Sequence, residues 1–287
     1  MKVLLDTDIG NDIDDAVALA YLLRQPKCDL IGITAVTGQA QKRAALCEIV
    51  CRAAGREDIP IHLGREEPLL TGPGQPNPRQ YEAVSDLPHR VDRPANTVVE
   101  FLRQTIRENP GEITLLSIGP LSNIALLFAI DPEVSGLLAE FVSMAGSFFP
   151  GAPEKEWNCR VDLLATAMVF NGSHTPPPNP HRNFGLDVTM KCRMSADEVR
   201  TRFNVEPLST VLQMAEQWFH DSSEITFHDP LAASCLFKPE LCSYLGGKIE
   251  ADLEGKTTFT RSDQAQHEVA QTVDSGAFFE EFFSVFK

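Results

Sequence analysis

Five aspartates follow a short apolar run at the start of the sequence, and this arrangement restricts the folds open to the chain. Val3, Leu4 and Leu5 predict a buried strand, positions 6, 8, 12, 14 and 15 are all aspartate, and an apolar helical pattern begins at Ala16. Aspartate is rare inside strands but suits strand ends, turns and helix N-termini, where free N–H groups and the helix dipole favour negative charge. We therefore expect a strand that ends, turns and enters a helix.

The density of these acids indicates a bound cation. Like charges packed at the end of a strand repel one another and raise each other's pKa values. A divalent cation would keep them ionised, and carboxylates are hard oxygen ligands suited to calcium or magnesium. An EF-hand loop starting at Asp6 does not fit, because Gly10 falls at position five and Asn11 at position six, where the glycine should stand. A phosphatase of the haloacid dehalogenase type also opens with Asp-x-Asp, but it expects Thr or Val in place of Gly10. A solvated acidic turn that caps the helix is the plain alternative.

Strand and helix patterns alternate along the chain. Strands are predicted at 28–36, 59–64, 112–118, 141–145 and 183–191, and helices at 16–25, 41–56, 95–109, 121–130 and 205–220. This alternation predicts an α/β fold, with a mostly parallel, open, Rossmann-like central sheet and helices on both faces, in a single domain over residues 1–287. In such sheets ligands bind at the carboxyl ends of the strands. Residues 64–94 are rich in Pro and Gly and predict a long surface loop, which is a candidate substrate lid.

Composition limits the partners and the compartment. The formal charge of −15 argues against a surface for nucleic acid or for an anionic membrane, because both require clustered Lys and Arg. Seven cysteines without CxxC spacing fit reduced thiols. The first strand begins too early to leave room for a signal peptide, and no apolar run approaches the ~20 residues of a membrane span. We expect a cytoplasmic protein.

Three further segments carry polar residues at the ends of predicted elements. The strand at 112–118 runs into Gly-Pro-Leu-Ser-Asn at 119–123, which alone predicts a tight turn into a helix. The triplet Glu-Trp-Asn at 156–158 would turn both polar side chains the same way if extended, although a polar surface loop fits equally well. His-Asp-Pro at 228–230 alone predicts a helix cap, with Pro at the first helical position.

Together these segments resemble the motifs of the nucleoside hydrolase family, the inosine–uridine-preferring N-ribohydrolases. Residues 6–16 resemble its opening Asp-x-Asp-(Pro)-Gly-x-Asp-Asp-Ala motif, with two additional residues between Gly10 and Asp14. Residues 119–123 resemble its Gly-Pro-Leu-Thr-Asn segment and 156–158 its Glu-Phe-Asn. Residues 183–191 resemble its Pro-Leu-Asp-Val-Thr, in which Asp187 is expected to be structural. The His228-Asp229 pair matches the family's late His and Asp, and the resemblance extends over essentially the whole chain.

The resemblance implies Ca²⁺-dependent hydrolysis of the N-glycosidic bond of ribonucleosides, with release of ribose and the free base. A water on the metal would attack the sugar, with Asp8 as general base, and His228 would protonate the leaving base. The implied site residues form two sets. The ion would be held by Asp8, Asp15, the Ile118 carbonyl and Asp229, and the substrate would be bound by Asp14, Gln39, Glu156, Asn158 and Asp229. Family analogy also implies a homo-oligomer, a dimer or a tetramer.

Some points stay open at the level of sequence. A non-catalytic nucleoside- or ribose-binding protein could keep the same metal site, and the phosphatase is a second alternative. Purine or pyrimidine preference and the role of Asp12 in the longer loop are not determined. Pro150 stands where the family often has an Asn for the 5′-hydroxyl, so the contact to that group is unassigned. In the helix 205–220, the larger apolar side chains are expected in the core or in a pocket wall, namely Met214, Trp218 and Phe219.

Overall fold

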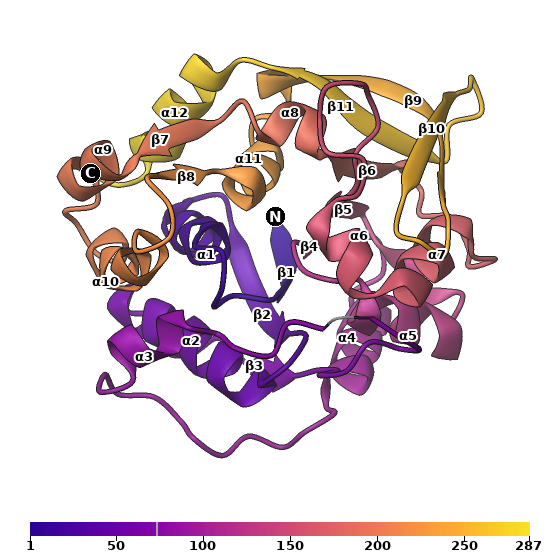
Figure 1. Cartoon of the computed structure of the whole chain (residues 1–287). Coiled ribbons are helices and arrows are strands. Elements are labelled where there is room, and N and C mark those ends of the chain that lie inside the picture. Colours follow the sequence, from indigo (N-terminus) through magenta and orange to yellow (C-terminus); the bar gives the residue numbers. More distant parts are fainter. Residues whose placement is uncertain (73) are drawn as a thin grey trace.

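A computed structural model describes residues 1–72 and 74–287, and within them nine strands form one sheet in the order β10-β9-β11-β6-β5-β4-β1-β2-β3 (Figure 1). The pairs from β11 across to β3 are parallel, whereas β9 runs antiparallel to both β10 and β11. The expected α/β fold with a mostly parallel central sheet is confirmed. The strands are β1 (Lys2–Thr7), β2 (Asp29–Ala35), β3 (Ile61–Leu63), β4 (Ile113–Ser117), β5 (Glu140–Met144), β6 (His181–Phe184), β9 (Cys242–Ala251), β10 (Thr257–Arg261) and β11 (His267–Val273).

Helices surround the sheet (Figure 1). Two large apolar cores fill the space between the helices and the sheet. The two cores are separate because successive side chains of a strand point to opposite faces of the sheet. In β1, Val3 and Leu5 belong to one core and Leu4 to the other. The longer helices are α1 (Asp14–Arg24), α2 (Ala40–Ala53), α4 (Val98–Glu108), α5 (Ser122–Ile130), α7 (Leu163–Asn171), α10 (Leu208–Trp218), α11 (His228–Cys235) and α12 (Ser275–Ser284). The first core receives α1, α2, α10, α11 and α12, and the second receives α4, α5 and α7.

Shorter elements complete the fold. They are the helices α3 (Gln80–Val84), α6 (Trp157–Val161), α8 (Leu186–Thr189) and α9 (Ala196–Arg202), the 3-10 turns Val134–Leu137 and Pro239–Leu241, and the antiparallel pair β7 (Arg193–Ser195) and β8 (Glu224–Thr226). Helix α3 lies inside the expected loop 64–94, of which one position falls outside the described residues. In the described part of the chain, no helix combines the length and the apolar character that a membrane crossing requires.

The strand predicted over 183–191 is wrong beyond its first two residues. Strand β6 ends at Phe184, which pairs with Met144, the last residue of β5, so β5 offers no partner beyond this point. The chain turns instead into α8, where Asp187 accepts hydrogen bonds from the backbone N–H groups of Phe148 and Phe149, at 2.8 Å each. Asp187 thus holds the segment after β5, which is the structural role expected of it.

Candidate active site

A cavity of about 440 Å³ opens at the carboxyl ends of β1, β4 and β5, where the sequence places its acids. The side chains that line it come from segments far apart in the chain. They include most of the expected site residues, namely Asp8, Asp14, Asp15, Ile118, Glu156, Asn158, His228 and Asp229, and also Asp12 of the longer aspartate loop. The parallel sheet brings these segments together, because parallel strands end at the same edge.

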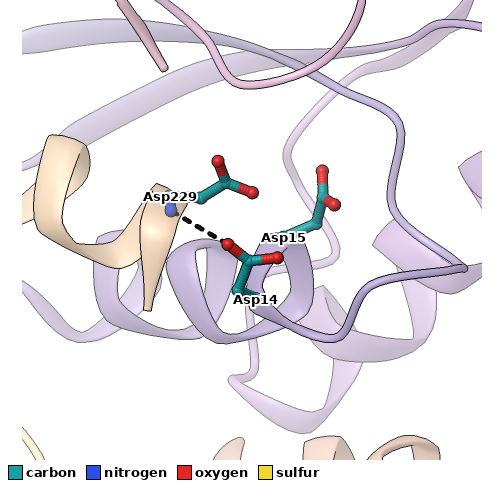
Figure 2. Close-up of side chains that lie close together, drawn as sticks. All are labelled: Asp14, Asp15 and Asp229. Atoms are coloured by element: carbon teal, nitrogen blue, oxygen red, sulfur yellow. Dashed lines mark hydrogen bonds between the residues drawn. The ribbon is translucent and has the colours of Figure 1, made fainter. Parts of the chain in front are cut away.

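Three carboxylates meet at one side of this cavity (Figure 2). Asp14 and Asp15 begin α1, Asp229 lies in the first turn of α11, and one oxygen of each lies within 4.8 Å of the others. Asp14 Oδ2 also accepts a hydrogen bond of 3.0 Å from the backbone N–H of Asp229, which ties the two helices together (Figure 2). Calcium takes oxygen ligands at about 2.3–2.6 Å, so two ligands of one ion can be at most about 5 Å apart. The three carboxylates therefore fit a calcium ion.

Burial makes this cluster costly to ionise. Thr7 Oγ1 donates a hydrogen bond of 2.5 Å to Asp15 Oδ1, yet burial still raises the pKa of Asp15 to about 7 and that of Asp12 to about 6. Burial, and then the neighbouring carboxylates, raise the pKa values of Asp14 and Asp229 well above the ordinary range. Such shifts concentrate at functional sites, and a divalent cation would reverse them.

Asp8 lies beside the three carboxylates. Its side chain is buried at the end of β1, where burial raises its pKa well above the ordinary range and the charge of Asp15 raises it further. Gly119 allows the close approach of β4, because a Cβ there would lie 2.9 Å from both the backbone N and Oδ1 of Asp8. Asp6 is buried away from the cavity and accepts hydrogen bonds from Thr34 and Asn123 at 2.5 and 2.7 Å. The pair of cavity-facing aspartates that a phosphatase of the dehalogenase type requires is therefore not formed.

Glu156 and Asn158 reach the cavity by a route that differs from the expected one. The triplet is not extended, since α6 begins at Trp157 and Glu156 caps it by accepting from the N–H groups of Asn158 and Cys159 at 2.7 and 2.9 Å. Asn158 Nδ2 donates to the carbonyls of Ile118 and Met144 at 3.0 and 3.2 Å. These bonds use the amide donors, so the Asn158 oxygen is the group left for a ligand, and the Ile118 carbonyl keeps its second lone pair.

His228 lines the cavity at the start of α11, and its Nδ1 atom lies 2.7 Å from Thr189 Oγ1. Thr189 Oγ1 is also within 3.1 Å of the carbonyl of Gly185. When the Thr189 hydroxyl donates to that carbonyl, a neutral His228 ring donates from Nδ1 and keeps Nε2 as an acceptor. Burial lowers the pKa of His228 to about 4, well below the ordinary value of 6.5.

Two sets of residues depart from the expected site. The structure does not bring Gln39 to the cavity, because its side chain donates to Asn77 Oδ1 at 3.1 Å, outside the lining. Conversely, six polar side chains of the lining were not singled out as site residues in the sequence, namely Asn11, Gln75, Arg79, Gln80, Gln217 and Asp221. Half of them come from the Pro-rich loop, whose length was the available signal. The expectation for α10 is confirmed, since Met214 is buried in the core and Trp218 lines the cavity.

Comparison with known proteins identifies the family. A sequence profile described as inosine-uridine preferring nucleoside hydrolase matches residues 3–280. Proteins named pyrimidine-specific ribonucleoside hydrolase RihA from Escherichia coli and Klebsiella pneumoniae are 30% and 31% identical to this chain, and each match covers 90% of this chain and 86% of the relative.

Solved structures share the fold at lower identity. They include the plant nucleoside hydrolase PpNRh1 (TM-score 0.82, 24% identical) and a purine-preferring ribonucleoside hydrolase from Gardnerella vaginalis (TM-score 0.80, 21% identical). Each comparison covers 99% of this chain and 98% of the other. The chain belongs to the inosine-uridine preferring nucleoside hydrolase family and is an enzyme that hydrolyses the N-glycosyl bond of ribonucleosides.

Proposed function

We propose that this enzyme acts with a bound calcium ion and uses Asp8 as general base. The observation that carries the proposal is the meeting of Asp229 with Asp14 and Asp15, more than 200 residues apart in the chain, beside Asp8 and in one cavity. Four buried carboxylates without a cation would repel one another at neutral pH. Asp8, Asp15, Asp229 and the Ile118 carbonyl are the proposed ligands, and the three-carboxylate group adds Asp14 to the candidates.

Each side chain then has a chemical task. Cleavage of an N-glycosidic bond passes through a ribosyl cation, so the site must supply a nucleophile and tolerate positive charge on the sugar. Calcium, when bound, contributes a positive charge that acidifies water and attracts sugar hydroxyls. While it is ionised, Asp8 offsets the positive charge that develops on the ribosyl group, and it becomes neutral when it takes the proton of the attacking water. Glu156 and Asn158, fixed by the cap of α6, bind the ribose and place its C1′ atom against the water.

His228 is the proposed partner of the leaving base. Its Nε2 atom accepts a hydrogen bond from the base while the ring is neutral, and it donates a proton only after the ring is charged. Because the pKa of His228 is about 4, the charged ring is scarce at neutral pH. The contribution of this residue as an acid is therefore expected to grow as the pH falls.

A direct test measures ribose release from a panel of ribonucleosides, with and without a chelator. Uridine and cytidine come first, because the relatives that are 30% identical are named pyrimidine-specific, and inosine and adenosine follow. We expect activity that EGTA abolishes and calcium restores. Asp8→Asn should remain folded and lose about 10² to 10⁴ in kcat, the usual contribution of a general base. Full activity in EGTA, or in Asp8→Asn, would contradict the proposal. Light scattering on the same sample tests the proposed dimer or tetramer.

A further inference from the structure

Arg43 is the one arginine or lysine among the described residues that is fully buried, and it lies next to the acidic cluster. It projects from α2, whose neighbouring buried residues are Ala40, Ala44 and Cys47. A guanidinium without water is stable only when its donors are matched by acceptors. The partners of Arg43 therefore show what holds it in the interior.

All three nitrogens of the Arg43 guanidinium, which together form a planar fork of donors, bind acceptors on three segments of the chain. Nη1 donates to the carbonyls of Asp8 and Ile9, the latter at 3.0 Å, and so holds the end of β1. Nη2 donates to Asn11 Oδ1 at 3.0 Å and to the carbonyl of Gln75 at 2.5 Å, and Nε donates to the carbonyl of Gly38 at 2.8 Å. One side chain thus connects the aspartate loop, the turn before α2 and the segment 75–80.

The segment 75–80 is also bound to the aspartate loop independently of Arg43. Gln80 Nε2 donates to the carbonyls of Asn11 and Asp12 at 3.0 and 2.9 Å, and Gln80 N donates to the Gly10 carbonyl at 3.1 Å. Gly10 has a φ of +134°, and a Cβ there would lie 2.4 Å from Pro78 Cβ, so the two segments are in direct contact. Asn11 and Asp12 of the longer loop are thereby bound by the segment 75–80, and Asn11 is also bound by Arg43 of α2.

We propose that Arg43 is a positioning residue of the active site, which fixes the lengthened aspartate loop against the segment 75–80 and so holds Asp8 in its productive orientation. The inference rests on the proposed function, because it assigns the loop to the reaction. It follows that residues 75–80 form a fixed wall of the cavity and do not move as a lid. Arg43 is not among the residues that line the cavity, and it acts through the main chain of Asp8 and Ile9.

The positioning role of Arg43 depends on the geometry of its guanidinium and not on its positive charge alone. Arg43 also places a positive charge near the carboxylates of Asp8 and Asp15, which lysine would supply as well. Lysine has three donors on a single nitrogen and cannot span acceptors on three segments. The two contributions can therefore be separated by substitution.

The test compares Arg43→Met, which removes the charge and the fork, with Arg43→Lys, which keeps the charge. Arg52→Met is the matched control, because Arg52 lies on the same helix, is partly exposed, and pairs with the buried Glu48 and the exposed Glu57. For each variant we would measure kcat and KM on the best ribonucleoside at saturating calcium, the calcium Kd by titration calorimetry, and amide exchange over residues 8–13 and 75–80.

We expect Arg43→Met to lower kcat about 100-fold, the usual effect of a 1 Å displacement at a reacting centre, with a change in KM below about fivefold. Its calcium Kd should rise about tenfold, and both segments should exchange faster. Arg43→Lys should recover less than about tenfold of the lost kcat, and Arg52→Met should stay within about twofold of the wild type. A purely structural role would lower the melting temperature and leave kcat and calcium Kd of the folded protein unchanged.

The proposal is overturned if Arg43→Met keeps kcat and calcium Kd within about threefold of the wild type, or if Arg43→Lys restores both. If Arg43→Met does not fold, Arg43→Lys is decided by the same criteria, together with Asn11→Ala, which removes one acceptor of the fork. Arg43→Lys and Asn11→Ala should then each lower kcat. A wild-type kcat in both variants would overturn the proposal. If the wild type releases no ribose from any nucleoside, the proposed function fails, while calcium Kd and amide exchange still test the position of the loop.

Discussion

Replacing Asp14 with Asn should stabilise the enzyme without calcium and weaken its response to calcium. Asn keeps an oxygen that can accept the hydrogen bond from the N–H of Asp229, so the tie between α1 and α11 remains. What disappears is one negative charge from a group of carboxylates whose oxygens lie within 4.8 Å of one another. The variant therefore separates the charge of Asp14 from its structural hydrogen bond.

The magnitude follows from the spacing of the carboxylates. Two ionised groups within 4.8 Å repel by about 3 kcal/mol or more at an effective dielectric constant of about 20. Partial protonation relieves some of the repulsion, so we count one pair, about 3 kcal/mol. With about 2 cal/mol/K per residue for the entropy of unfolding, 287 residues convert this to a rise in Tm of about 5 °C.

Calcium should act in the opposite direction. At a thousandfold excess over Kd it would stabilise the wild type by about 4 kcal/mol, or about 7 °C. If the loss of Asp14 weakens binding a hundredfold, the same calcium concentration stabilises the variant by about 1.4 kcal/mol, or about 2 °C.

The measurement is made at pH 8 because the pKa of Asp15 is raised. The pKa of Asp15 is raised to about 7, so the folded protein binds this proton more tightly than the unfolded chain does. The free energy of unfolding therefore falls as the pH rises from about 4 to 7, and the penalty is complete at pH 8. The buried His228 and His267, whose pKa values are lowered to about 4, act in the other direction. They are neutral in both states at this pH and make no contribution.

The assay is thermal unfolding by circular dichroism in EGTA and in calcium, with Asp86→Asn as the control because Asp86 is exposed. The control should shift Tm by less than about 1 °C in both conditions. A lower Tm for Asp14→Asn than for the wild type in EGTA would refute the repulsion reasoning. An unchanged calcium response would place Asp14 away from the ion.

Two further predictions concern the cavity. If His228 supplies a proton, His228→Gln should lose more kcat/KM at pH 5 than at pH 8, since its pKa is about 4; equal losses across the pH profile would remove the acid role. Gly119→Ala should lower kcat at least about tenfold by displacing Asp8, because the new Cβ would lie 2.9 Å from the Asp8 N and Oδ1 atoms. Gly276→Ala, whose nearest contact would be 3.5 Å, is the control, and equal activity of the two variants would contradict the prediction.

Much of the fold and part of the site could be predicted because their signals are local. The aspartates after Leu5 mark the end of a strand, and alternating strand and helix patterns imply a parallel sheet that gathers strand ends at one edge. That edge does collect Asp8, Ile118 and Glu156. The geometry of Glu156 was not predictable, because its side chain is held by the N–H groups of Asn158 and Cys159 in the cap of α6 and by that of Gly146 after β5, and the sequence pattern is also compatible with a strand.

The position of residues 75–80 in the wall of the cavity could not be predicted from local sequence patterns. Residues 75–80 have no periodic pattern, and their place is set by hydrogen bonds to a loop about 65 residues earlier, through Gln80 and Arg43. The sequence does contain a signal for Arg43, because this charged residue interrupts the buried face of α2 that Ala40, Ala44 and Cys47 form. A charged residue on a buried helical face predicts a buried partner. It cannot identify that partner, because main-chain carbonyls such as those of Asp8 and Gln75 leave no trace in the sequence.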